Sequence, residues 1–371
     1  MRLLICAIQF KGGSLQVVLS LINEFKKFPE NEYHVIMSDM VSAQLNHHEF
    51  PVNFRFYNFP FTGSISVSKM FKRVKWLRSI ETKIRPDCVI TTSGPIYWRS
   101  KAPMLMGYNL PANIYLDSPY FKMMAASKRF KWWMKKVIQR YFFKREAEMF
   151  FVQTDDVNYR LRKYLHQDNV RTISNTYSDV FRNIVVYADK LPQRKSGEIR
   201  LLTVSTYYPH KNFEIIKSVI TELRKRGIRN IRFILTIQTE FYSKIFGTDY
   251  KDEVINIGPV KSIECPSLYR ECDVMFLPSL LECFSASYAE AMVIHKPILT
   301  TDLDFAHTVC GDAALYFSPV NPVDVVDKLE MLLHDRHLSE TLIRNGEKRL
   351  SMFGTAEDRA REILVLCRQL I

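Results

Sequence analysis

Short runs of strand-forming, mainly apolar residues alternate along the chain with longer stretches whose apolar residues recur at helical spacing. The strand-like runs lie at 1–9, 33–37, 88–92, 113–116, 150–154, 170–175, 199–205, 233–237, 254–257, 273–277 and 298–301. Short apolar runs of this kind are typical of strands buried on both faces of a parallel sheet. Their alternation with helices predicts an α/β protein made of doubly wound parallel sheets.

A polar stretch at 179–198 divides this alternation into two halves. It contains Pro192 and Gly197, residue types that are common in connections between domains. The 371 residues are enough for two hydrophobic cores. We therefore predict, in chain order, a first domain at 1–178, a linker at 179–198, a second domain at 199–353 and a final helix within 354–371.

The positive charge of the chain is concentrated in its first half. The net charge is +13, and residues 1–185 hold 28 Lys and Arg against 14 Asp and Glu. An excess confined to one half indicates an anionic partner for that half, either a nucleic acid or an anionic membrane surface.

Two stretches of the first half combine basic and apolar residues at helical spacing. Residues 67–84 are predicted to form a helix with one apolar and one basic face. Residues 128–145 (KRFKWWMKKVIQRYFFKR) add aromatic residues, as in helices that lie in a membrane interface. A core helix with a solvated basic face is an equal alternative, and nucleic acid ranks third because no nucleic-acid-binding motif accompanies the stretch. We predict contact with an anionic membrane surface through 128–145 and no nucleic-acid partner.

Cysteine use and hydropathy indicate a cytoplasmic protein. The seven cysteines form no C-x-x-C pair and lie mostly in apolar runs, as reduced core thiols do. The apolar run at the N-terminus is too short for a signal sequence, and no window of about eighteen uninterrupted apolar residues exists. We expect a cytoplasmic protein that is peripheral on the inner face of the cytoplasmic membrane.

The largest group of candidate functional residues lies in the stretch 278–302, PSLLECFSASYAEAMVIHKPILTTD. The pattern predicts strand, loop, helix and strand, with Glu282 in the loop and Glu290 in the helix. The small residues Ser285, Ala286 and Ser287 lie between them at the predicted start of the helix. Small side chains leave the free N–H groups of a first helical turn accessible, and those groups favour phosphate. Either glutamate alone is an ordinary solvated acid, whereas the pair in this setting indicates a site.

The residues of this stretch resemble a known motif. Pro278-Ser279, Glu282, Phe284, Glu290-Ala291-Met292 and Lys296-Pro297-Ile298 are similar to the donor-site signature E-x-F-G-x-x-x-x-E-A-M-A-x-G-x-P of retaining glycosyltransferases of the GT-B fold, family 4. The chain departs from the signature at two glycines, which are replaced by Ser285 and His295. The resemblance implies that Glu290 binds the ribose hydroxyls of a nucleotide-sugar and that Glu282 holds the donor sugar.

The same resemblance assigns further residues to the donor site. The N–H groups of Phe284, Ser285, Ala286 and Ser287 are expected to bind the diphosphate. Lys211, in the segment YYPHKN, matches the lysine that neutralises it, and Thr206 stands where the family has an arginine. The other residues expected at the site are Val260 at the nucleotide base, Gly12 and Gly13 in a loop over the phosphates, and Asp117 as a substitute for a histidine at the reaction centre.

The resemblance implies an overall fold and a reaction. The fold is GT-B, with two Rossmann-like domains facing across a cleft and the final helix packed back on the first domain. The reaction moves a sugar from UDP or GDP, with retention, to a hydroxyl of a glycan or lipid-linked acceptor in cell-surface polysaccharide synthesis. No cofactor is expected, nor a metal at Asp302 and Asp304. A sugar-nucleotide epimerase, a phosphorylase or a non-catalytic nucleotide-sugar-binding protein are the alternatives.

Overall fold

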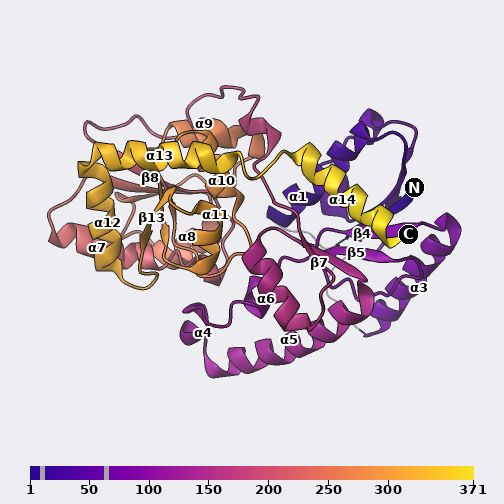
Figure 1. The fold of residues 1–371 in the computed structure, drawn as a ribbon. Helices are drawn as coiled ribbons and strands as arrows, with labels where there is room; N and C mark the ends of the chain where they lie inside the picture. Colours follow the sequence, from indigo (N-terminus) through magenta and orange to yellow (C-terminus); the bar gives the residue numbers. More distant parts are fainter. Residues whose placement is uncertain (9–12, 62–66) are drawn as a thin grey trace. The chain divides into compact units, whose positions relative to one another are not determined.

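The computed structural model describes residues 1–8, 13–61 and 67–371 and divides the chain into two compact units (Figure 1). The first unit consists of Met1–Ile114, Ala125–Ser174 and Thr355–Ile371. The second consists of Tyr115–Met124 and Asn175–Gly354. The chain therefore passes between the units four times, and the segment 115–124 belongs to the second unit although its neighbours on both sides belong to the first.

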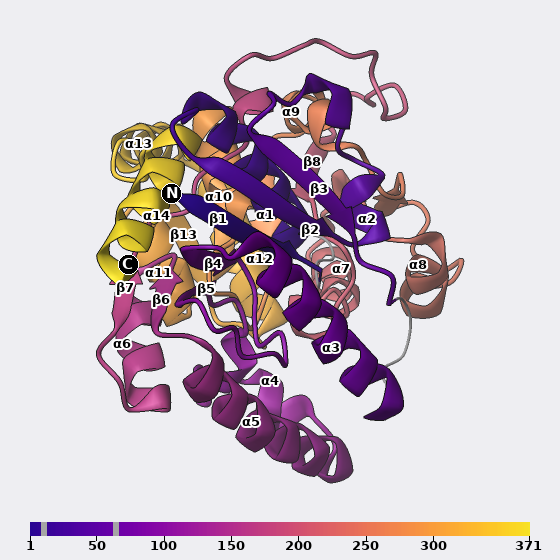
Figure 2. The ribbon, with the colours of Figure 1, turned by 90° about the vertical axis from the view of Figure 1, so that its right-hand side faces the viewer.

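A seven-stranded parallel sheet forms the centre of the first unit, in the order β3-β2-β1-β4-β5-β6-β7. The strands are β1 (Arg2–Ala7), β2 (Glu32–Met37), β3 (Phe54–Asn58), β4 (Cys88–Thr91), β5 (Met104–Gly107), β6 (Met149–Val152) and β7 (Val170–Thr172). The helices are α1 (Gly13–Glu24), α2 (Asp39–Ser42), α3 (Val67–Ile84), α5 (Ala126–Glu146), α6 (Asp155–Leu165) and α14 (Ala356–Leu370). Figure 2 shows the sheet of this unit with α3 and α5 as its long outer helices.

The strand predicted at 113–116 is wrong. Pro111–Asn113 form a 3-10 turn, and the strand in this part of the sheet is β5. Pro111 has no N–H to donate to a ladder, and the neighbouring residues are typical of a turn. The sequence pattern also did not indicate β3, which is half-exposed at the edge of the sheet and therefore lacks a continuous apolar run.

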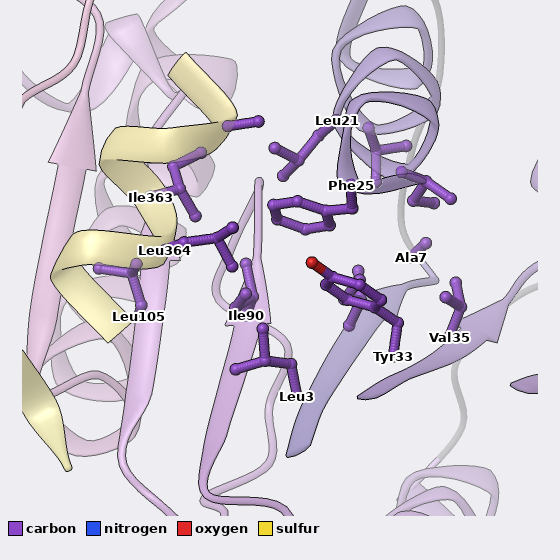
Figure 3. Close-up of a cluster of buried hydrophobic side chains, with 14 of the residues drawn as sticks. Leu3, Ala7, Leu21, Phe25, Tyr33, Val35, Ile90, Leu105, Ile363 and Leu364 are labelled. Carbon is purple, nitrogen blue, oxygen red and sulfur yellow. The ribbon is translucent and has the colours of Figure 1, made fainter. Parts of the chain in front are cut away.

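The final helix closes the core of the first unit. A capping box between Thr355 and Asp358 begins α14. Its buried residues Ile363 and Leu364 join the cluster that contains Phe25 and the strand side chains, and Figure 3 shows Leu364 reaching toward Phe25. At the rim, Lys27 lies 3.1 Å from a carboxylate oxygen of Glu357 in α14.

A six-stranded parallel sheet forms the second unit, in the order β10-β9-β8-β11-β12-β13. The strands are β8 (Ile199–Thr203), β9 (Ile231–Leu235), β10 (Val254–Asn256), β11 (Val274–Leu277), β12 (Ile298–Thr301) and β13 (Ala314–Phe317). The helices are α4 (Tyr120–Met123), α7 (Ile215–Lys225), α8 (Thr239–Phe246), α9 (Cys265–Arg270), α10 (Ala286–Val293), α11 (Asp304–Cys310), α12 (Pro322–His334) and α13 (Arg336–Leu350). The prediction of two doubly wound parallel sheets is confirmed.

The core of the second unit is formed by the sheet together with α7 and α12. Helix α7 buries Ile216, Val219, Ile220 and Leu223 on one stripe, as the helical spacing requires. The Asn321 side chain accepts the Val323 N–H at the start of α12. These helices hold the sheet whose strand ends carry the candidate residues.

The segment 115–124 is attached to the second unit by specific contacts. The Ser118 hydroxyl donates a buried 2.7 Å hydrogen bond to the Leu280 carbonyl. Tyr115 lies edge-on to Phe305, with ring centroids 6.2 Å apart. The segment thus packs beside the loop that follows β11.

Candidate functional site

The candidate site lies where the strand order of the second unit reverses. From β8 the chain adds β9 and β10 on one side, and from β11 it adds β12 and β13 on the other. Neighbouring connections then leave in opposite directions, and open α/β sheets bind ligands at the carboxyl ends of the strands at such a switch point, here β8 and β11. The loop after β8 carries Lys211, and the loop after β11 carries Glu282.

The segment Pro209-His210-Lys211-Asn212 turns sharply after β8. Pro209–Lys211 form a 3-10 turn, and Asn212 ends it in the left-handed region with φ 56°. Asparagine tolerates this conformation better than most residues. The Asn212 side chain also donates a 3.2 Å hydrogen bond to the Pro319 carbonyl. The turn fixes the base of the Lys211 side chain, a role for Asn212 that the sequence interpretation missed although an Asn after a Pro turn is a usable signal.

Lys211 and Glu282 form the central ion pair of the site. Lys211 Nζ lies 2.5 Å from Glu282 Oε1, and the two side chains are only 15% and 11% exposed. Their loops are also tied through the backbone, because the Leu280 N–H donates to the His210 carbonyl at 2.7 Å. The structure therefore brings together the two residues that the sequence selected from positions far apart in the chain.

Helix α10 begins directly after this loop. Ser285 is its N-cap residue, with φ −103° and ψ 117°, and Ala286 is its first helical residue. Its first turn carries no acidic side chain. The Phe284 ring turns away to pack edge-on against Phe353. The Tyr288 N–H donates to the Ser285 carbonyl at 3.2 Å, whereas the N–H groups of Ala286 and Ser287 have no preceding helical turn to donate to. They carry the positive end of the helix dipole, which suits a phosphate.

Glu290 lies further along α10. Its Oε2 accepts a 3.0 Å hydrogen bond from the Tyr269 hydroxyl in α9. Burial raises the pKa of Glu290 to about 7, and the hydrogen bond from Tyr269 acts against this rise. The sequence gave no signal that joins Tyr269 to Glu290, because the contact links two helices.

His210 was also missed by the sequence interpretation. Its ring stacks on Tyr208, with centroids 5.5 Å apart, and meets the edge of Tyr120 at 6.1 Å. Burial lowers the pKa of His210 to about 4, so the imidazole is neutral at pH 7. The neutral His210 ring and the two tyrosine rings therefore pack together next to the charged Lys211–Glu282 pair.

Comparison with known families identifies this arrangement. Residues 189–349 match the family model described as glycosyl transferases group 1. The matched residues are fewer than half of the chain, and they resemble a glycosyl transferases group 1 domain. The match covers the β8 and β11 loops and α10, and so confirms the resemblance that the sequence motif indicated.

Two curated relatives match the chain over part of its length. It is 27% identical over 163 residues to the O-antigen chain mannosyltransferase RfbU of Salmonella typhimurium, which covers 42% of this chain and 45% of that protein. It is 26% identical over 126 residues to the capsular polysaccharide biosynthesis glycosyltransferase CapM of Staphylococcus aureus, 33% of each. The matched stretch thus spans about half the length of these relatives or less.

Solved structures resemble the whole chain. Anabaena HepE in complex with UDP-glucose superposes with a TM-score of 0.74 at 12% identity and covers 100% of both chains. WaaG, a glycosyltransferase involved in lipopolysaccharide biosynthesis, gives 0.72 at 12% identity and covers 97% of this chain and 99% of its own. The chain has the fold of these proteins, the GT-B fold.

The remaining candidates within residues 189–349 lie at the same edge of the sheet. Thr206 is half-buried after β8, and its carbonyl accepts the Ser205 hydroxyl at 3.0 Å. Val260 is half-buried after β10, behind Gly258 with φ +74°. Ser287 is buried in the first turn of α10. Thr206 follows β8 and Ser287 lies in the helix after β11, whereas Val260 follows the edge strand β10.

The candidates outside residues 189–349 are less informative. Gly12 lies outside the residues that the structure describes, and Gly13 begins α1 of the first unit. Asp117 is exposed in the segment 115–124, next to the buried Ser118. Because the predicted strand before it is absent, Asp117 belongs to a loop of the second unit.

The D-x-D sequence after β12 is a loop and helix start. Asp302 Oδ1 lies 2.6 Å from His307 Nε2, and Asp304 is the first residue of α11. Within 1–8, 13–61 and 67–371, no three His, Cys, Asp or Glu side chains gather as metal ligands do. In the same ranges, no helix has the length and apolar character needed to cross a bilayer.

Proposed function

We propose that the protein is a retaining glycosyltransferase that moves a sugar from a UDP- or GDP-sugar to a hydroxyl of a glycan or lipid-linked acceptor in cell-surface polysaccharide synthesis. The observation that carries this proposal is the Lys211–Glu282 ion pair at the N-terminus of α10, with Glu290 on the same helix. The match to the group 1 family model supports it, as do relatives named for O-antigen and capsule synthesis and a neighbour solved with UDP-glucose.

The site residues divide the work of the reaction. The leaving group of a nucleotide-sugar is a diphosphate, which gains negative charge as the glycosidic bond breaks. Lys211 and the first turn of α10 stabilise that charge. Glu282 orients the donor sugar, and Glu290 accepts hydrogen bonds from ribose hydroxyls, for which a carboxylate is suited.

The pairing of Glu282 argues against a covalent glycosyl-enzyme route to the proposed retention. A carboxylate held 2.5 Å from Lys211 Nζ is a weak nucleophile. We therefore propose that the reaction depends on stabilisation of the departing diphosphate and not on a covalent bond to Glu282. Proton NMR of the first product formed tests this directly. The anomeric configuration of the donor should persist in the product, and its inversion would refute retention.

Calorimetry against a panel of UDP- and GDP-sugars tests the donor site. We expect one of them to bind, and Glu290→Ala to weaken that binding. Absence of binding, or binding unaffected by the substitution, would refute the enzyme assignment and favour a non-catalytic protein. Product analysis with an acceptor separates transfer from an isomerised nucleotide-sugar or a sugar phosphate, which an epimerase or a phosphorylase would release.

The outer face of α5 supports an acceptor at the membrane. Its apolar stripe is open to solvent, with Phe130 63% exposed, Trp133 51%, Val137 51% and Tyr141 57%. The face toward the body of the first unit is more polar, and includes the buried Gln139, Phe143 and Glu146. The basic residues that accompany the stripe are Lys128, Arg129, Lys131, Lys135, Lys136, Arg140, Lys144 and Arg145. This is the pattern of a helix that lies in an anionic interface, so we propose peripheral binding at the cytoplasmic membrane.

Sedimentation with vesicles tests the membrane contact. Vesicles that contain phosphatidylglycerol should bind the protein, and vesicles of phosphatidylcholine alone should bind it less. Val137→Glu should lower the bound fraction about tenfold, because a charge replaces an exposed apolar side chain that would be buried in the membrane interface. Val323→Glu is the matched control, since Val323 is 43% exposed on α12 of the second unit. Equal loss in both variants, or no binding to either vesicle, would contradict the membrane contact.

A further inference from the structure

The hydrogen bond between Tyr269 and Glu290 is unusual in its setting. Tyr269 is 1% exposed and buried in α9, and its hydroxyl reaches Glu290 Oε2 at 3.0 Å. The Ser287 carbonyl, at 3.4 Å, is a second and longer contact of the same hydroxyl. The Tyr269 ring is held edge-on by Phe181, with centroids 5.7 Å apart. The position of the hydroxyl is therefore set by packing on both sides.

The hydrogen bond from Tyr269 makes the two carboxylate oxygens of Glu290 different from each other. Oε2 is occupied by Tyr269, and among the residues that the structure describes none donates to Oε1. A carboxylate whose one oxygen is fixed has a defined plane, so its other oxygen faces a defined direction. A free carboxylate on a helix would instead rotate about its side-chain torsions, and a ligand would have to restrict that rotation on binding.

We propose that Tyr269 is a positioning residue for nucleotide binding, which holds Glu290 so that Oε1 accepts the ribose hydroxyls of a nucleoside diphosphate. This inference rests on the proposed function, because it needs Glu290 to meet ribose. It assigns Tyr269 no contact with the ligand.

The charge of Glu290 depends on the same bond. The titratable groups that face Glu290 are Tyr269 and Cys265, both in α9. Burial raises the pKa of both groups above the physiological range, so both are neutral. The Tyr269 hydroxyl favours the ionised carboxylate, whereas burial opposes it. Removal of the hydroxyl therefore raises the pKa of Glu290 and leaves less of the acceptor form at neutral pH.

The test compares Tyr269→Phe with Tyr288→Phe. Both tyrosines are buried, and the Tyr288 hydroxyl bonds Thr300 Oγ1 at 2.8 Å, away from Glu290 Oε2. Each variant keeps its aromatic ring and loses one buried hydroxyl. A general loss of packing or stability should therefore affect both variants in a similar way. Thermal unfolding confirms that both are folded at the assay temperature.

The measured quantity is the ratio of the affinity for the ribonucleotide to the affinity for its 2′,3′-dideoxy analogue. Calorimetry at pH 8 uses UDP or GDP, whichever the wild-type protein binds more tightly, and the 2′,3′-dideoxy analogue of the same nucleotide. The wild-type protein should prefer the ribose form by at least about tenfold, because the hydroxyls bond a carboxylate. In Tyr269→Phe the preference should fall to about threefold or less, and Tyr288→Phe should keep it.

A pH series gives a second readout. The terminal phosphate titrates equally in both nucleotides, so the affinity ratio reports Glu290 alone. The pH at which the preference is half lost should lie higher in Tyr269→Phe than in the wild-type protein.

The outcomes separate the inference from the function on which it rests. If the wild-type protein binds neither nucleotide, the proposed function fails and the inference fails with it. If the wild-type protein binds but does not prefer ribose, the role of Glu290 is refuted. If the preference and its pH midpoint are unchanged in Tyr269→Phe, or change equally in Tyr288→Phe, the bond is structural and the inference alone is refuted.

Discussion

The side chains of the donor site have their charges set before any ligand arrives. Lys211 and Glu282 neutralise each other at 2.5 Å. His210 is neutral because burial lowers its pKa to about 4. Glu290 is the residue whose charge changes near physiological pH, because burial raises its pKa to about 7. The pH response of the site should therefore be governed by Glu290.

Glu290 should reduce the stability of the ligand-free protein at high pH. Its pKa is raised from 4.5 to about 7 in the folded state, so the folded state holds a proton that the unfolded state releases between these values. Stability contributed by this group is thus present below pH 4.5 and lost as pH rises through 7. Glu290→Gln should raise the melting temperature relative to wild type at pH 8 and show a smaller difference at pH 5.

The control for this measurement is Glu240→Gln, which changes an exposed glutamate in α8. A difference between wild type and Glu290→Gln that does not grow between pH 5 and pH 8 would contradict the prediction.

His295 occupies a backbone position that suits glycine. Its φ is +57°, in the left-handed region, which costs an L-residue roughly 1–2 kcal/mol. Its 3.4 Å ion pair with Glu347 is half-exposed and offsets little of that cost. His295→Gly should therefore stabilise the second unit by about 0.5–1 kcal/mol, measured by urea unfolding. His295→Ala keeps the Cβ atom, and stability equal to that of the glycine variant would show that strain is not the cause.

Ser285 and His295 both replace glycines of the family motif, but their backbone conformations differ. Ser285 has an ordinary φ of −103°, so serine fits without strain, whereas His295 does not. The sequence could locate both departures but not distinguish them, because φ is not visible in a motif. The sequence selected Glu282 and Glu290 by their local spacing and Lys211 by the segment around it, and it missed Tyr269, whose partner lies on another helix.

At the scale of elements, burial on both faces made several central strands visible in the sequence. Central strands such as β1, β4 and β11 are continuous apolar runs and were predicted. The edge strand β3 is half-exposed and its apolar pattern is interrupted, so it was not predicted. Strands β5 and β13 were not predicted either, although both are mainly apolar. Helix α5 was predicted at nearly its full length, but the direction of its apolar stripe could not be: the exposed stripe is known only from the structure.

Helix α14 should be essential to the first unit. Leu364 is 2% exposed within the cluster of that unit. Leu364→Ala should cost about 2–5 kcal/mol, because it removes buried methyl groups and leaves a cavity. Val365→Ala, on the same helix but 42% exposed, should cost less than about 1 kcal/mol. Denaturant unfolding followed by tryptophan fluorescence checks both, and equal effects would contradict the role of α14 in the core.

At the scale of the whole molecule, the two units can be observed separately. The four tryptophans are Trp76, Trp98, Trp132 and Trp133, all in the first unit. Tryptophan fluorescence therefore reports the first unit alone, whereas far-ultraviolet circular dichroism reports both. The sequence predicted the two sheets but not the excursion at 115–124, because its contacts are with residues far along the chain.

The position of α14 also determines when the first unit can be completed during synthesis. The strands of that unit end at Thr172, but the helix that covers part of its core ends at Leu370. At roughly 5–20 residues per second, the ribosome needs about 10–40 s to make the intervening chain. During that time the surface that Ile363 and Leu364 will cover stays open in the nascent protein. The unit made first is therefore finished last, and part of its apolar surface is exposed over that interval.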